Sequence, residues 1–252
     1  MRLFACDLDN TLFSSKTKDA PGNVCIECLS DGRKLFMDAR TVEALRSLMK
    51  QEDVLFLPVT SRSIVQYTRI TWPDGCAPEY AVTTNGAVLL RNNESDLTWW
   101  QESETAISPY TDELNAWCER LQREKYFVRS KIVDDSFLYG YADVDTDVAA
   151  CAECYRKQTD LHVAWFDRKI YFFPDSIDKG TAVSRFCKLF DFEKTISAGD
   201  SFMDIPMLET TDAAIIPFSL KEELKGRVCS IMDEGGSFPD FALIEAMRLL
   251  GE

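Results

Sequence analysis

Met1-Arg-Leu-Phe-Ala-Cys-Asp7-Leu-Asp9-Asn-Thr11 is the stretch that decides the fold of this chain. Its apolar part, residues 3–6, is typical of a buried strand in a parallel sheet. Because side chains alternate along a strand, Asp7 and Asp9 are expected to point the same way at its carboxyl end, where open α/β sheets bind ligands. Two neighbouring carboxylates repel each other, so the pair indicates metal binding or shared proton chemistry. The alternative is a strand that ends in an Asp-Asn turn.

The composition is that of a globular protein with room for one large or two modest domains. The chain has 252 residues, of which 46% are hydrophobic and 28% charged. A net charge of −14 argues against nucleic acid or an anionic membrane as partner, while a local basic pocket stays compatible with it. No apolar run approaches the ~20 residues of a membrane span, and Asp7 and Asp9 interrupt any apolar signal segment. We expect a cytoplasmic protein, and the composition makes no prediction of its oligomeric state.

The cysteines indicate a reducing compartment. Nine are too few for a disulfide scaffold at this length, and nine is an odd number. Two Cys-x-x-Cys pairs, Cys25/Cys28 and Cys151/Cys154, have a spacing that zinc sites also use. The pairs lie far apart in the sequence, one in an expected hairpin and one in an expected helix, and His162 is the only histidine. We expect buried free thiols rather than a zinc site.

Residues 1–90 alternate strands and helices. After the first strand we expect a hairpin, because Asp31-Gly32 lies between two strand-like runs. This hairpin is placed to act as a flap over Asp7 and Asp9. The expected elements are hairpin strands over 24–27 and 34–37, a helix over 41–50, a strand over 54–59, a helix over 63–70 and a strand over 80–84 that ends at Asn85-Gly86. This alternation indicates a parallel sheet.

Residues 91–174 have a different order, α-β-β repeated twice. The expected helices cover 109–124 and 146–158, and the expected strands cover 126–133, 136–144, 161–166 and 169–173. Adjacent hairpin strands imply an antiparallel sheet with helices on one face, hence a separate small domain. The first order then returns, with a helix from Lys179, a strand over 195–198, a helix over 205–209, a strand over 213–216 and a helix over 238–250. The sequence therefore predicts an α/β protein whose parallel-sheet core, residues 1–90 and 175–252, carries an inserted α+β cap, residues 91–174.

Four groups of polar residues follow strands or begin helices of the predicted core. They are Asp7/Asp9, Thr60, Lys179 and Asp200/Asp204. The loops at the carboxyl ends of one parallel sheet converge in space, and carboxylates with one cation and one hydroxyl suit phosphoryl transfer to a carboxylate. In that reaction Asp7 becomes an aspartyl-phosphate, while Asp9 protonates the leaving alkoxide and later deprotonates water. Thr60 and Lys179 would bind the transferring group, and Mg²⁺ on oxygen ligands would neutralise the repulsion between the ester and Asp7.

Each of these groups also has a structural interpretation. Thr60 could cap the helix that follows it, and Lys179 could be a solvated lysine at a helix start. Asp200 and Asp204 could be a helix cap and a first-turn acid favoured by the helix dipole. The order of the groups and their placement at strand ends favour catalysis over these alternatives.

The four groups lie in ordered motifs that resemble those of the haloacid dehalogenase (HAD) superfamily. The motifs are Asp7-Leu-Asp9-Asn-Thr11, the strand that ends in Thr60, Asp178-Lys179-Gly180-Thr181 and Gly199-Asp200-Ser201-Phe-Met-Asp204. The stretch Asn85-Gly86-Ala87 is similar to one found in the Cof-type and sugar-phosphatase branch, whose cap the twice-repeated α-β-β insert also resembles. The resemblance covers essentially the whole chain and implies a Rossmann-like parallel-sheet HAD core with an inserted α-β-β-α-β-β cap.

The resemblance also implies a role for each matching residue. Asp7 is the nucleophile and Asp9 the acid/base, while Thr60 and Lys179 bind the phosphoryl group. The Mg²⁺ ligands are Asp7, Asp200 and the backbone carbonyl of Asp9, with Asp204 in or near that shell. An acid at position 9 favours phosphatases, because dehalogenases of the superfamily lack it.

Three features depart from the family pattern. Ser61 stands where the usual Thr-Gly-Arg has glycine, so the backbone cannot rely on the conformational freedom of glycine there. Met203 stands where the last motif has Asn, which removes an amide that can orient the metal shell or the phosphoryl oxygens. The insert is compact, which leaves a smaller cap surface for substrate. None of the three removes a group that the chemistry requires.

Substrate specificity should come from the insert and from loops facing Asp7. Arg62 and Asn85 are the candidate substrate-binding residues of the core, with Lys131, Arg168 and the Trp99-Trp100 pair as further candidates. Arg129 and Lys131 alternate on one expected strand, where they either face a phosphate-bearing substrate or form a solvated sheet face. The tryptophan pair is better interpreted as core or hinge packing than as a sugar platform.

The sequence thus predicts a Mg²⁺-dependent phosphomonoesterase that hydrolyses a small phosphorylated metabolite through an aspartyl-phosphate. A sugar phosphate is the expectation from the family, by analogy of fold. Two alternatives stay open: a phosphomutase that returns the phosphoryl group to its substrate, and a phosphometabolite-binding or partner-binding module with weak turnover.

Overall fold

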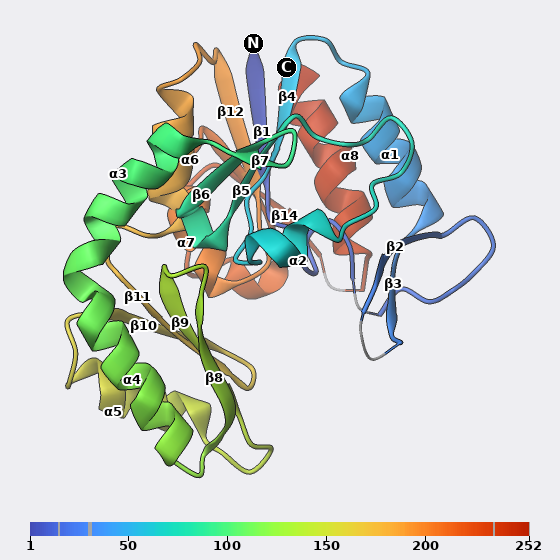
Figure 1. Ribbon diagram of the computed structural model, residues 1–252. Coiled ribbons are helices and arrows are strands. Elements are labelled where there is room, and N and C mark those ends of the chain that lie inside the picture. Colours follow the sequence, from blue (N-terminus) through green and yellow to red (C-terminus); the bar gives the residue numbers. More distant parts are fainter. Residues whose placement is uncertain (15, 30–31, 234, 252) are drawn as a thin grey trace.

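The core of the protein is a five-stranded parallel sheet. The computed structural model describes residues 1–252 except 15, 30–31, 234 and 252. The strand order is β14 (Cys229–Met232), β13 (Ala213–Pro217), β12 (Lys194–Ala198), β1 (Arg2–Cys6) and β4 (Val54–Pro58), and each neighbouring pair is parallel (Figure 1). Residues 3–6 of β1 are fully buried, as their apolar character predicts. The predicted α/β core is confirmed.

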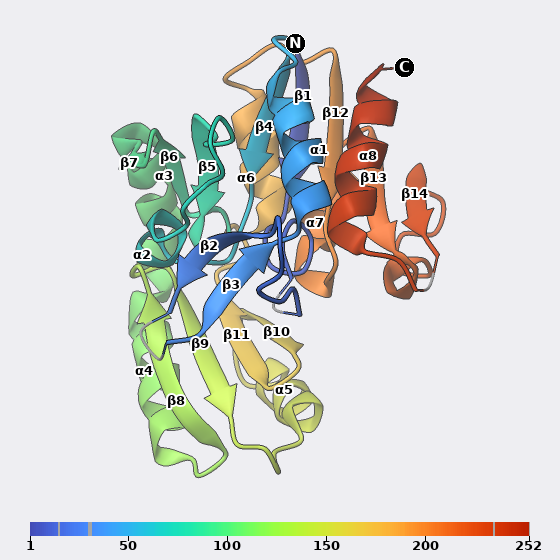
Figure 2. The same cartoon turned by 90° about the vertical axis from the view of Figure 1, so that its right-hand side faces the viewer.

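Helices cover both faces of this sheet. On one face, α1 (Ala39–Met49) and α8 (Phe238–Gly251) lie against each other, and α8 packs on β12 and β13 (Figure 2). On the other face, α6 (Lys179–Cys187) packs on α7 (Ile205–Thr210) (Figure 1). Cores on both sides of β1 result, because Phe4 and Cys6 belong to one buried cluster while Leu3 and Ala5 belong to the other. The parallel strands are therefore apolar on both faces.

The expected strand over 80–84 is present, but the prediction that it belongs to the parallel sheet is wrong. β5 (Tyr80–Thr83) pairs antiparallel with β6 (Val88–Arg91), which pairs with β7 (Glu94–Ser95). Its tie to the main sheet is one isolated parallel bridge, Val59 to Val82. The cause lies in the turn Thr84–Gly86, where both Thr84 and Asn85 have positive φ, so that the chain reverses and β6 takes the hydrogen bonds of β5.

The predicted hairpin is confirmed. β2 (Val24–Cys28) pairs antiparallel with β3 (Lys34–Met37), with a β-bulge between Cys25 and Glu27. The predicted Asp31-Gly32 turn falls partly on residues 30–31, which lie outside the described residues; Gly32 has φ +83°, the conformation that glycine favours. The bulge makes Ile26 and Glu27, two successive residues, both buried.

The insert forms a second, antiparallel sheet. Its order is β10 (His162–Phe166), β11 (Lys169–Phe173), β9 (Phe137–Ala142) and β8 (Phe127–Val133). Helices α4 (Thr111–Arg123) and α5 (Val148–Arg156) lie on one side of it (Figure 1). The predicted α-β-β repeat is confirmed, whereas helix α3 (Leu97–Ile107) was not predicted. The division at 90/91 and 174/175 stays our proposal for the domain boundaries.

Two contacts join the insert to the core near the strand ends. The Asp134 carboxylate, in the β8–β9 turn, accepts hydrogen bonds from the Ile64 backbone N–H of α2 (Ile64–Thr68) at 2.9 Å and from the Thr84 hydroxyl at 2.6 Å. The indole N–H of Trp99 donates to the Gly86 carbonyl at 3.1 Å, in a buried cluster with Val183 and Phe186 of α6. Trp99 is thus core packing, as expected.

Within the described residues, no helix has the length and apolar character needed to cross a membrane.

Candidate active site

The carboxyl ends of three neighbouring strands bring the predicted residues together. The last residue of β1, Cys6, is in register with Ala198 at the end of β12 and with Pro58 at the end of β4. Asp7, Thr60 and Asp200 follow these ends by one or two residues. Parallel strands in register end at one edge, so residues far apart in sequence meet there.

Lys179 lies at the centre of the site. Its ammonium donates to Asp7 Oδ1 at 2.6 Å and to Asp204 Oδ1 at 2.5 Å, and all three side chains are buried. Lys179 begins α6, whose N-cap Asp178 accepts hydrogen bonds from the next backbone N–H groups. A side chain at Gly180 would lie 2.3 Å from the Pro206 carbonyl oxygen, so glycine permits the close packing of α6 on α7. The interpretation of Lys179 as a solvated lysine is therefore wrong.

Asp204 is held by a set of donors from its own loop. Its Oδ2 accepts from the Asp200 N–H at 3.1 Å, the Ser201 N–H at 2.9 Å and the Ser201 hydroxyl at 2.8 Å. Asp200 in turn accepts from the Thr11 hydroxyl at 3.2 Å. A Cβ atom at position 199 would lie 2.4 Å from the Cβ of Asp204, so only glycine fits at this position without a clash. Asp204 ends the short 3₁₀ turn η3 (Phe202–Asp204) and is fully buried.

Burial and mutual repulsion control the ionisation of these carboxylates. Burial raises the pKa of Asp7 well above its usual value; Lys179 offsets part of this effect, and Asp204 and Asp200 add to it. Burial, followed by the charge of Asp204, raises the pKa of Asp200 to about 7. Burial alone would lower the pKa of Lys179, but Asp204 and Asp7 outweigh it and the pKa is raised. The site thus concentrates negative charge around one fixed cation.

Asp7, Asp200 and Asp204 can supply a metal site. One carboxylate oxygen from each of the three residues lies within 4.8 Å of the oxygens from the other two. Among the described residues, these three side chains form the cluster that could hold a metal ion. Hard oxygen donors in a buried site with excess negative charge fit a hard divalent cation such as Mg²⁺. The side chain of Asp9 is outside this group, and the role of its backbone carbonyl stays a prediction.

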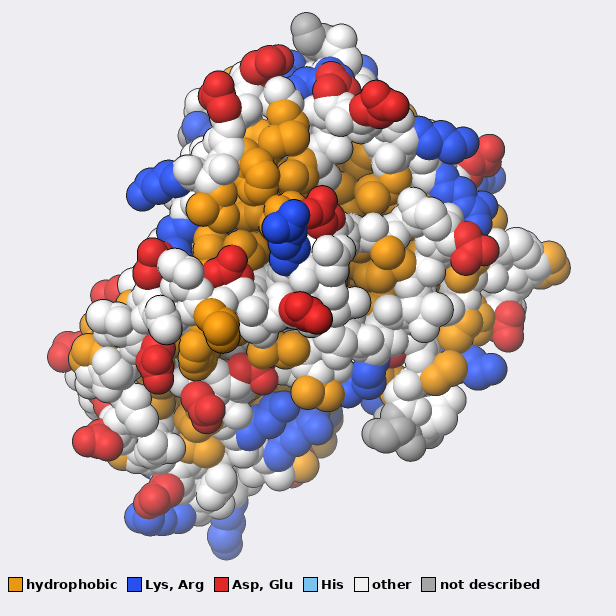
Figure 3. Space-filling model, turned by 45° about the horizontal axis from the view of Figure 1, so that its top comes forward, with side chains coloured by type: hydrophobic (Ala, Val, Ile, Leu, Met, Phe, Trp, Pro, Cys, Tyr) orange, Lys and Arg blue, Asp and Glu red, His pale blue; other side chains and the backbone are white. Residues whose placement is uncertain are grey.

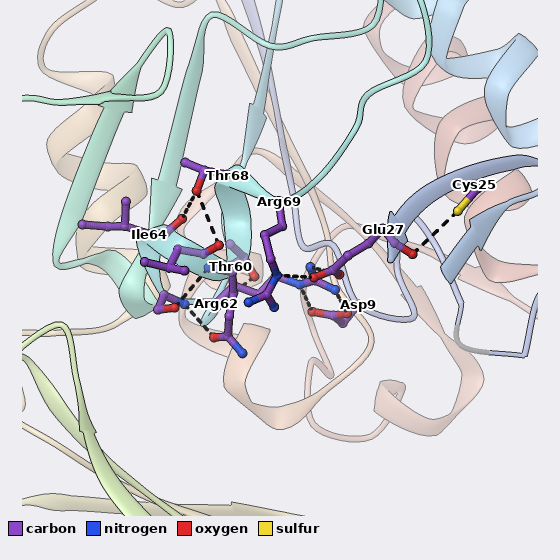
Figure 4. Close-up of polar contacts among 11 residues, drawn as sticks. Asp9, Cys25, Glu27, Thr60, Arg62, Ile64, Thr68 and Arg69 are labelled. Carbon is purple, nitrogen blue, oxygen red and sulfur yellow. Dashed lines mark hydrogen bonds and ion pairs between the residues drawn. The ribbon is translucent and has the colours of Figure 1, made fainter. Parts of the chain in front are cut away.

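Asp9 is instead bound by Arg62 (Figure 4). The guanidinium donates to both Asp9 oxygens at 2.7 Å and to Glu27 at 2.7 Å. Glu27 also accepts from Arg69 at 2.9 Å. Burial would raise the pKa of Asp9, but the hydrogen bonds and charge of Arg62 outweigh it, so the pKa is lowered. Sequence reasoning missed Glu27, although an acid within the apolar strand β2 was a signal of a buried ion pair.

Thr60 is buried beside these residues and does not cap α2. Its hydroxyl accepts from the Arg62 N–H at 3.2 Å. Ser63 is the N-cap of α2 and forms a capping box with Gln66. The capping interpretation of Thr60 is therefore wrong.

A cavity of about 450 Å³ opens onto the site. Asp7, Asp9, Arg62, Lys179 and Asp200 line it, and so do the departures Ser61 and Met203. Arg129 and Lys131 line it from the cap, together with Lys169, which sequence reasoning did not single out. Thr60 and Asp204 lie behind this surface, buried against the lining residues.

Two other substrate-binding candidates lie elsewhere. Asn85 is buried where the insert rejoins the core: its amide donates to the Ile177 carbonyl at 3.1 Å, and it lines a neighbouring cavity of about 810 Å³ rather than the one with Asp7. Arg168 donates to the Ala142 carbonyl and lies over the Tyr141 ring, away from the cavity lining. A substrate contact for either residue stays a prediction.

The expectation of buried thiols in the Cys-x-x-Cys pairs is corrected. Cys28 and Cys154 are exposed, and Cys25 and Cys151 are half-buried. The Cys25 and Cys28 sulfurs lie 3.8 Å apart, because the bulge in β2 turns both to one side. Cys151, on α5, packs against a buried apolar cluster, whereas Cys28 and Cys154 lie at the surface.

Comparison with known proteins supports this description. The family model described as haloacid dehalogenase-like hydrolase matches residues 124–225. No curated protein sequence matches the chain at a significant level. The sucrose-phosphatase of Synechocystis sp. PCC6803, solved with sucrose and phosphate, is 15% identical with a TM-score of 0.66, over 100% of this chain and 98% of that one. A haloacid dehalogenase-like hydrolase from B. subtilis is 16% identical with a TM-score of 0.63, over 99% and 100%.

A further solved structure carries the same fold. A subclass IIB sugar phosphatase of the HAD superfamily is 15% identical with a TM-score of 0.60, over 100% of this chain and 99% of that one. At such identities the similarity establishes the fold. The predicted fold is confirmed over the whole chain, and the predicted resemblance to haloacid dehalogenase-like hydrolases is supported by the family model over residues 124–225.

Proposed function

Because the chain has the fold of the haloacid dehalogenase-like hydrolases and matches their family model over residues 124–225, we propose that it is a Mg²⁺-dependent phosphomonoesterase. Its substrate is a small phosphorylated metabolite, a sugar phosphate first, and the reaction passes through an aspartyl-phosphate. One observation carries the proposal: the buried ion pairs of Lys179 with Asp7 and Asp204, with Asp200 beside them.

Asp7 acts as the nucleophile. Lys179 holds Asp7 Oδ1, so Oδ2 remains to attack phosphorus while Lys179 neutralises charge beside it. Burial opposes ionisation of Asp7, so an ionised nucleophile needs further positive charge. Mg²⁺ held by Asp7, Asp200 and Asp204 would supply that charge and offset the repulsion between Asp7 and the phosphate ester.

Asp9 acts as the acid/base once Arg62 has released it. In the free protein Arg62 keeps Asp9 ionised, which is the wrong state for a proton donor. A phosphoryl dianion in the cavity competes with Asp9 for the Arg62 guanidinium, because both present oxygens in bidentate geometry. Asp9 then takes up a proton and passes it to the leaving alkoxide. It later removes a proton from the water that cleaves the aspartyl-phosphate, which returns Asp7 and releases inorganic phosphate.

The direct test is phosphate release from a panel of phosphorylated metabolites, with Mg²⁺ and with EDTA. We expect release from a subset of small phosphate esters in Mg²⁺ and its loss in EDTA. Isomerised substrate without released phosphate would identify a mutase instead. Unchanged substrate bound by folded protein would identify a binding module.

Mg²⁺ should raise the thermal stability more at pH 8 than at pH 5.5. The pKa of Asp200 is near 7 in the folded protein against about 3.9 for an unperturbed carboxyl, so the folded state binds more protons between these values. Stability without metal therefore falls as the pH rises through this window, and the metal counteracts that loss.

Calorimetry checks this prediction. Mg²⁺ at 100 times its dissociation constant contributes about 2.7 kcal/mol, which for a chain of this size raises Tm by roughly 5–10 °C. Asp200→Asn is the matched variant, because it keeps the shape of the side chain and removes a ligand. An equal Mg²⁺ response in Asp200→Asn, or a larger one at pH 5.5, would contradict the proposed site.

Asp9→Asn should slow alkyl esters more than aryl esters. The amide cannot donate a proton to the leaving group, and general acids contribute about 10²–10⁴-fold to such steps. A phenolate leaves with little help, so the loss of kcat should be smaller for an aryl phosphate. The comparison of kcat for p-nitrophenyl phosphate and an alkyl phosphate tests this, and equal losses would rule out Asp9 as the general acid.

A further inference from the structure

The face of the cap sheet that looks into the active-site cavity combines cations with tyrosines. Two rows cross the sheet: Arg129, Tyr141, Lys169 and Phe166 are in register, and so are Lys131, Tyr139, Tyr171 and Ala164. Most of these side chains line the cavity that contains Asp7 and Asp9, whereas α4 and α5 cover the opposite face of the sheet. The alternation of strand side chains thus collects three cations, Arg129, Lys131 and Lys169, on one surface, here called the basic cap face.

The basic cap face contrasts with the charge of the whole protein. The net charge is −14, yet Lys and Arg side chains gather in a patch in the lower half of the space-filling view, while Asp and Glu side chains are scattered (Figure 3). Among the described residues that line the cavity, all four carboxylates, Asp7, Asp9, Glu27 and Asp200, belong to the core or the β2–β3 hairpin. The cap contributes cations and no acid to this lining.

Three of the four cavity acids already have a cationic partner, whereas the three cap cations have no anionic partner among the described residues. Lys179 binds Asp7, and Arg62 binds Asp9 and Glu27. Within the part of the chain that the structure describes, no ion pair involves Arg129, Lys131 or Lys169. Three unneutralised cations in a concave site attract an anion from outside the chain.

Arg129 is oriented for such an anion. Its guanidinium lies over the rings of Tyr139 and Tyr141, with centroids 5.7 and 5.5 Å away. Cation–π contacts of this kind hold an arginine side chain against the sheet instead of leaving it extended in water. Lys131 is two positions further along β8 and on the same face of the sheet. The two residues therefore flank one spot on β8, which is the edge strand of the cap sheet.

Lys169 lies between that spot and the catalytic aspartates. β11 is separated from β8 by β9 alone, which places Lys169 roughly 10 Å across the sheet from Arg129. Tyr171, two positions after Lys169 on the same face of β11, packs in one cluster with Met203 of the Asp200–Asp204 loop, and Lys169 and Tyr171 both line the cavity with Asp9. A group bound at Arg129 and Lys131 on β8 is therefore separated by strand β9 from Lys169, which lines the cavity with the acids, a position that suits a second group of the substrate rather than the transferring phosphoryl group.

We propose that the basic cap face binds a second anionic group of the substrate, so that the substrate is a phosphomonoester with a further carboxylate or phosphate. Arg129 and Lys131 bind the second anion, and Lys169 lies along the molecule between the two charged ends. This inference rests on the proposed phosphomonoesterase function and narrows its substrate class from phosphate esters in general to those with two anionic groups.

The test compares substrates in matched pairs that differ in one anionic group. Sorbitol 6-phosphate against 6-phosphogluconate, both open chains, varies a carboxylate, and fructose 6-phosphate against fructose 1,6-bisphosphate varies a phosphate. We expect KM of the wild-type protein to be at least about 10-fold lower for the two-anion member of one pair, since hydrogen bonds to charged groups contribute a factor of roughly 10 or more. The pair that shows the effect identifies the second group.

Variants locate the effect on the cap. Lys131→Gln and Arg129→Gln should each raise KM for the two-anion member about 10-fold or more, with a smaller effect on kcat and on the one-anion member. Lys125→Gln is the matched control, because Lys125 is an exposed cap lysine outside the cavity lining. Equal KM values within both pairs, or variants that weaken both members of a pair equally, would overturn the inference.

A binding measurement separates this inference from the proposed function. Absence of turnover for every compound, p-nitrophenyl phosphate included, would count against the phosphomonoesterase itself. Calorimetry with 6-phosphogluconate and sorbitol 6-phosphate on the Asp7→Asn protein then tests the basic cap face alone. Tighter binding of the two-anion compound that is lost in Lys131→Gln would support it, and equal binding of both compounds would refute it.

Discussion

Replacing Asp7 with Asn is expected to reduce phosphate release by about 10⁴-fold or more, because an amide cannot attack phosphorus as a carboxylate does. The fold should survive the change. Asn has nearly the same shape, and Lys179 keeps its ion pair with Asp204. The substitution also removes a buried charge, and with it the burial cost and the repulsion by Asp204 and Asp200 that together raise the pKa of Asp7.

Phosphate release in Mg²⁺ and circular dichroism of the same preparation together check this prediction. Asp145→Asn is the matched control, since Asp145 is an exposed cap residue outside the cavity lining, and it should retain wild-type turnover. Substantial turnover by purified Asp7→Asn would refute Asp7 as the nucleophile. Loss of turnover together with loss of the folded spectrum would show instead that Asp7 is needed for the fold.

Lys179→Met should lower the free energy of unfolding by about 3–5 kcal/mol and abolish turnover. The substitution leaves Asp7 and Asp204 buried beside each other without their cation, and breaking one side of a buried ion pair costs that much. The loss should shrink at pH 5, because burial raises the pKa of Asp7 and its protonation removes part of the uncompensated charge.

Urea unfolding in the absence of metal measures this loss. The double variant Lys179→Met/Asp204→Asn separates charge from packing: if uncompensated charge causes the loss, the second substitution restores part of the stability but none of the activity. A Lys179→Met protein as stable as the wild type at pH 8 would show that the ion pairs contribute little, and the central place of Lys179 in the proposed site would then be wrong.

Most of the elements could be predicted from local pattern. The apolar run of β1, the Asp-Gly hairpin and the twice-repeated α-β-β insert all have short-range signals, and each is present. Helix α3 was missed because Trp99 and Trp100 fall among polar residues without a clear apolar face, while Val183 and Phe186 of α6, which share the cluster of Trp99, lie far along the chain. The pairing of β5 was mispredicted because the reversal at Asn85 decides its partner, and not its own composition.

The candidate site, too, was predictable only in part. The motifs predicted that Asp7, Asp200, Asp204 and Lys179 would meet, and the structure brings them within contact of one another. This meeting was predictable because parallel strands end at one edge of the sheet, and the order of strands and helices along the chain shows which residues follow those ends. The binding of Asp9 by Arg62, and of Arg62 by Glu27, depends on a bulge in β2 and on the way the hairpin folds over the sheet.

The sequence by itself therefore determined the parallel-sheet core, the inserted cap and the four motifs at the strand ends, because periodicity and residue order are local properties. Only the tertiary structure decided which charges neutralise each other. Arg129, Lys131 and Lys169 could equally have formed a solvated sheet face, and the orientation of the cap over the core turned that face toward Asp7 and Asp9. Distances between side chains on separate elements set electrostatic interactions, and packing alone sets those distances.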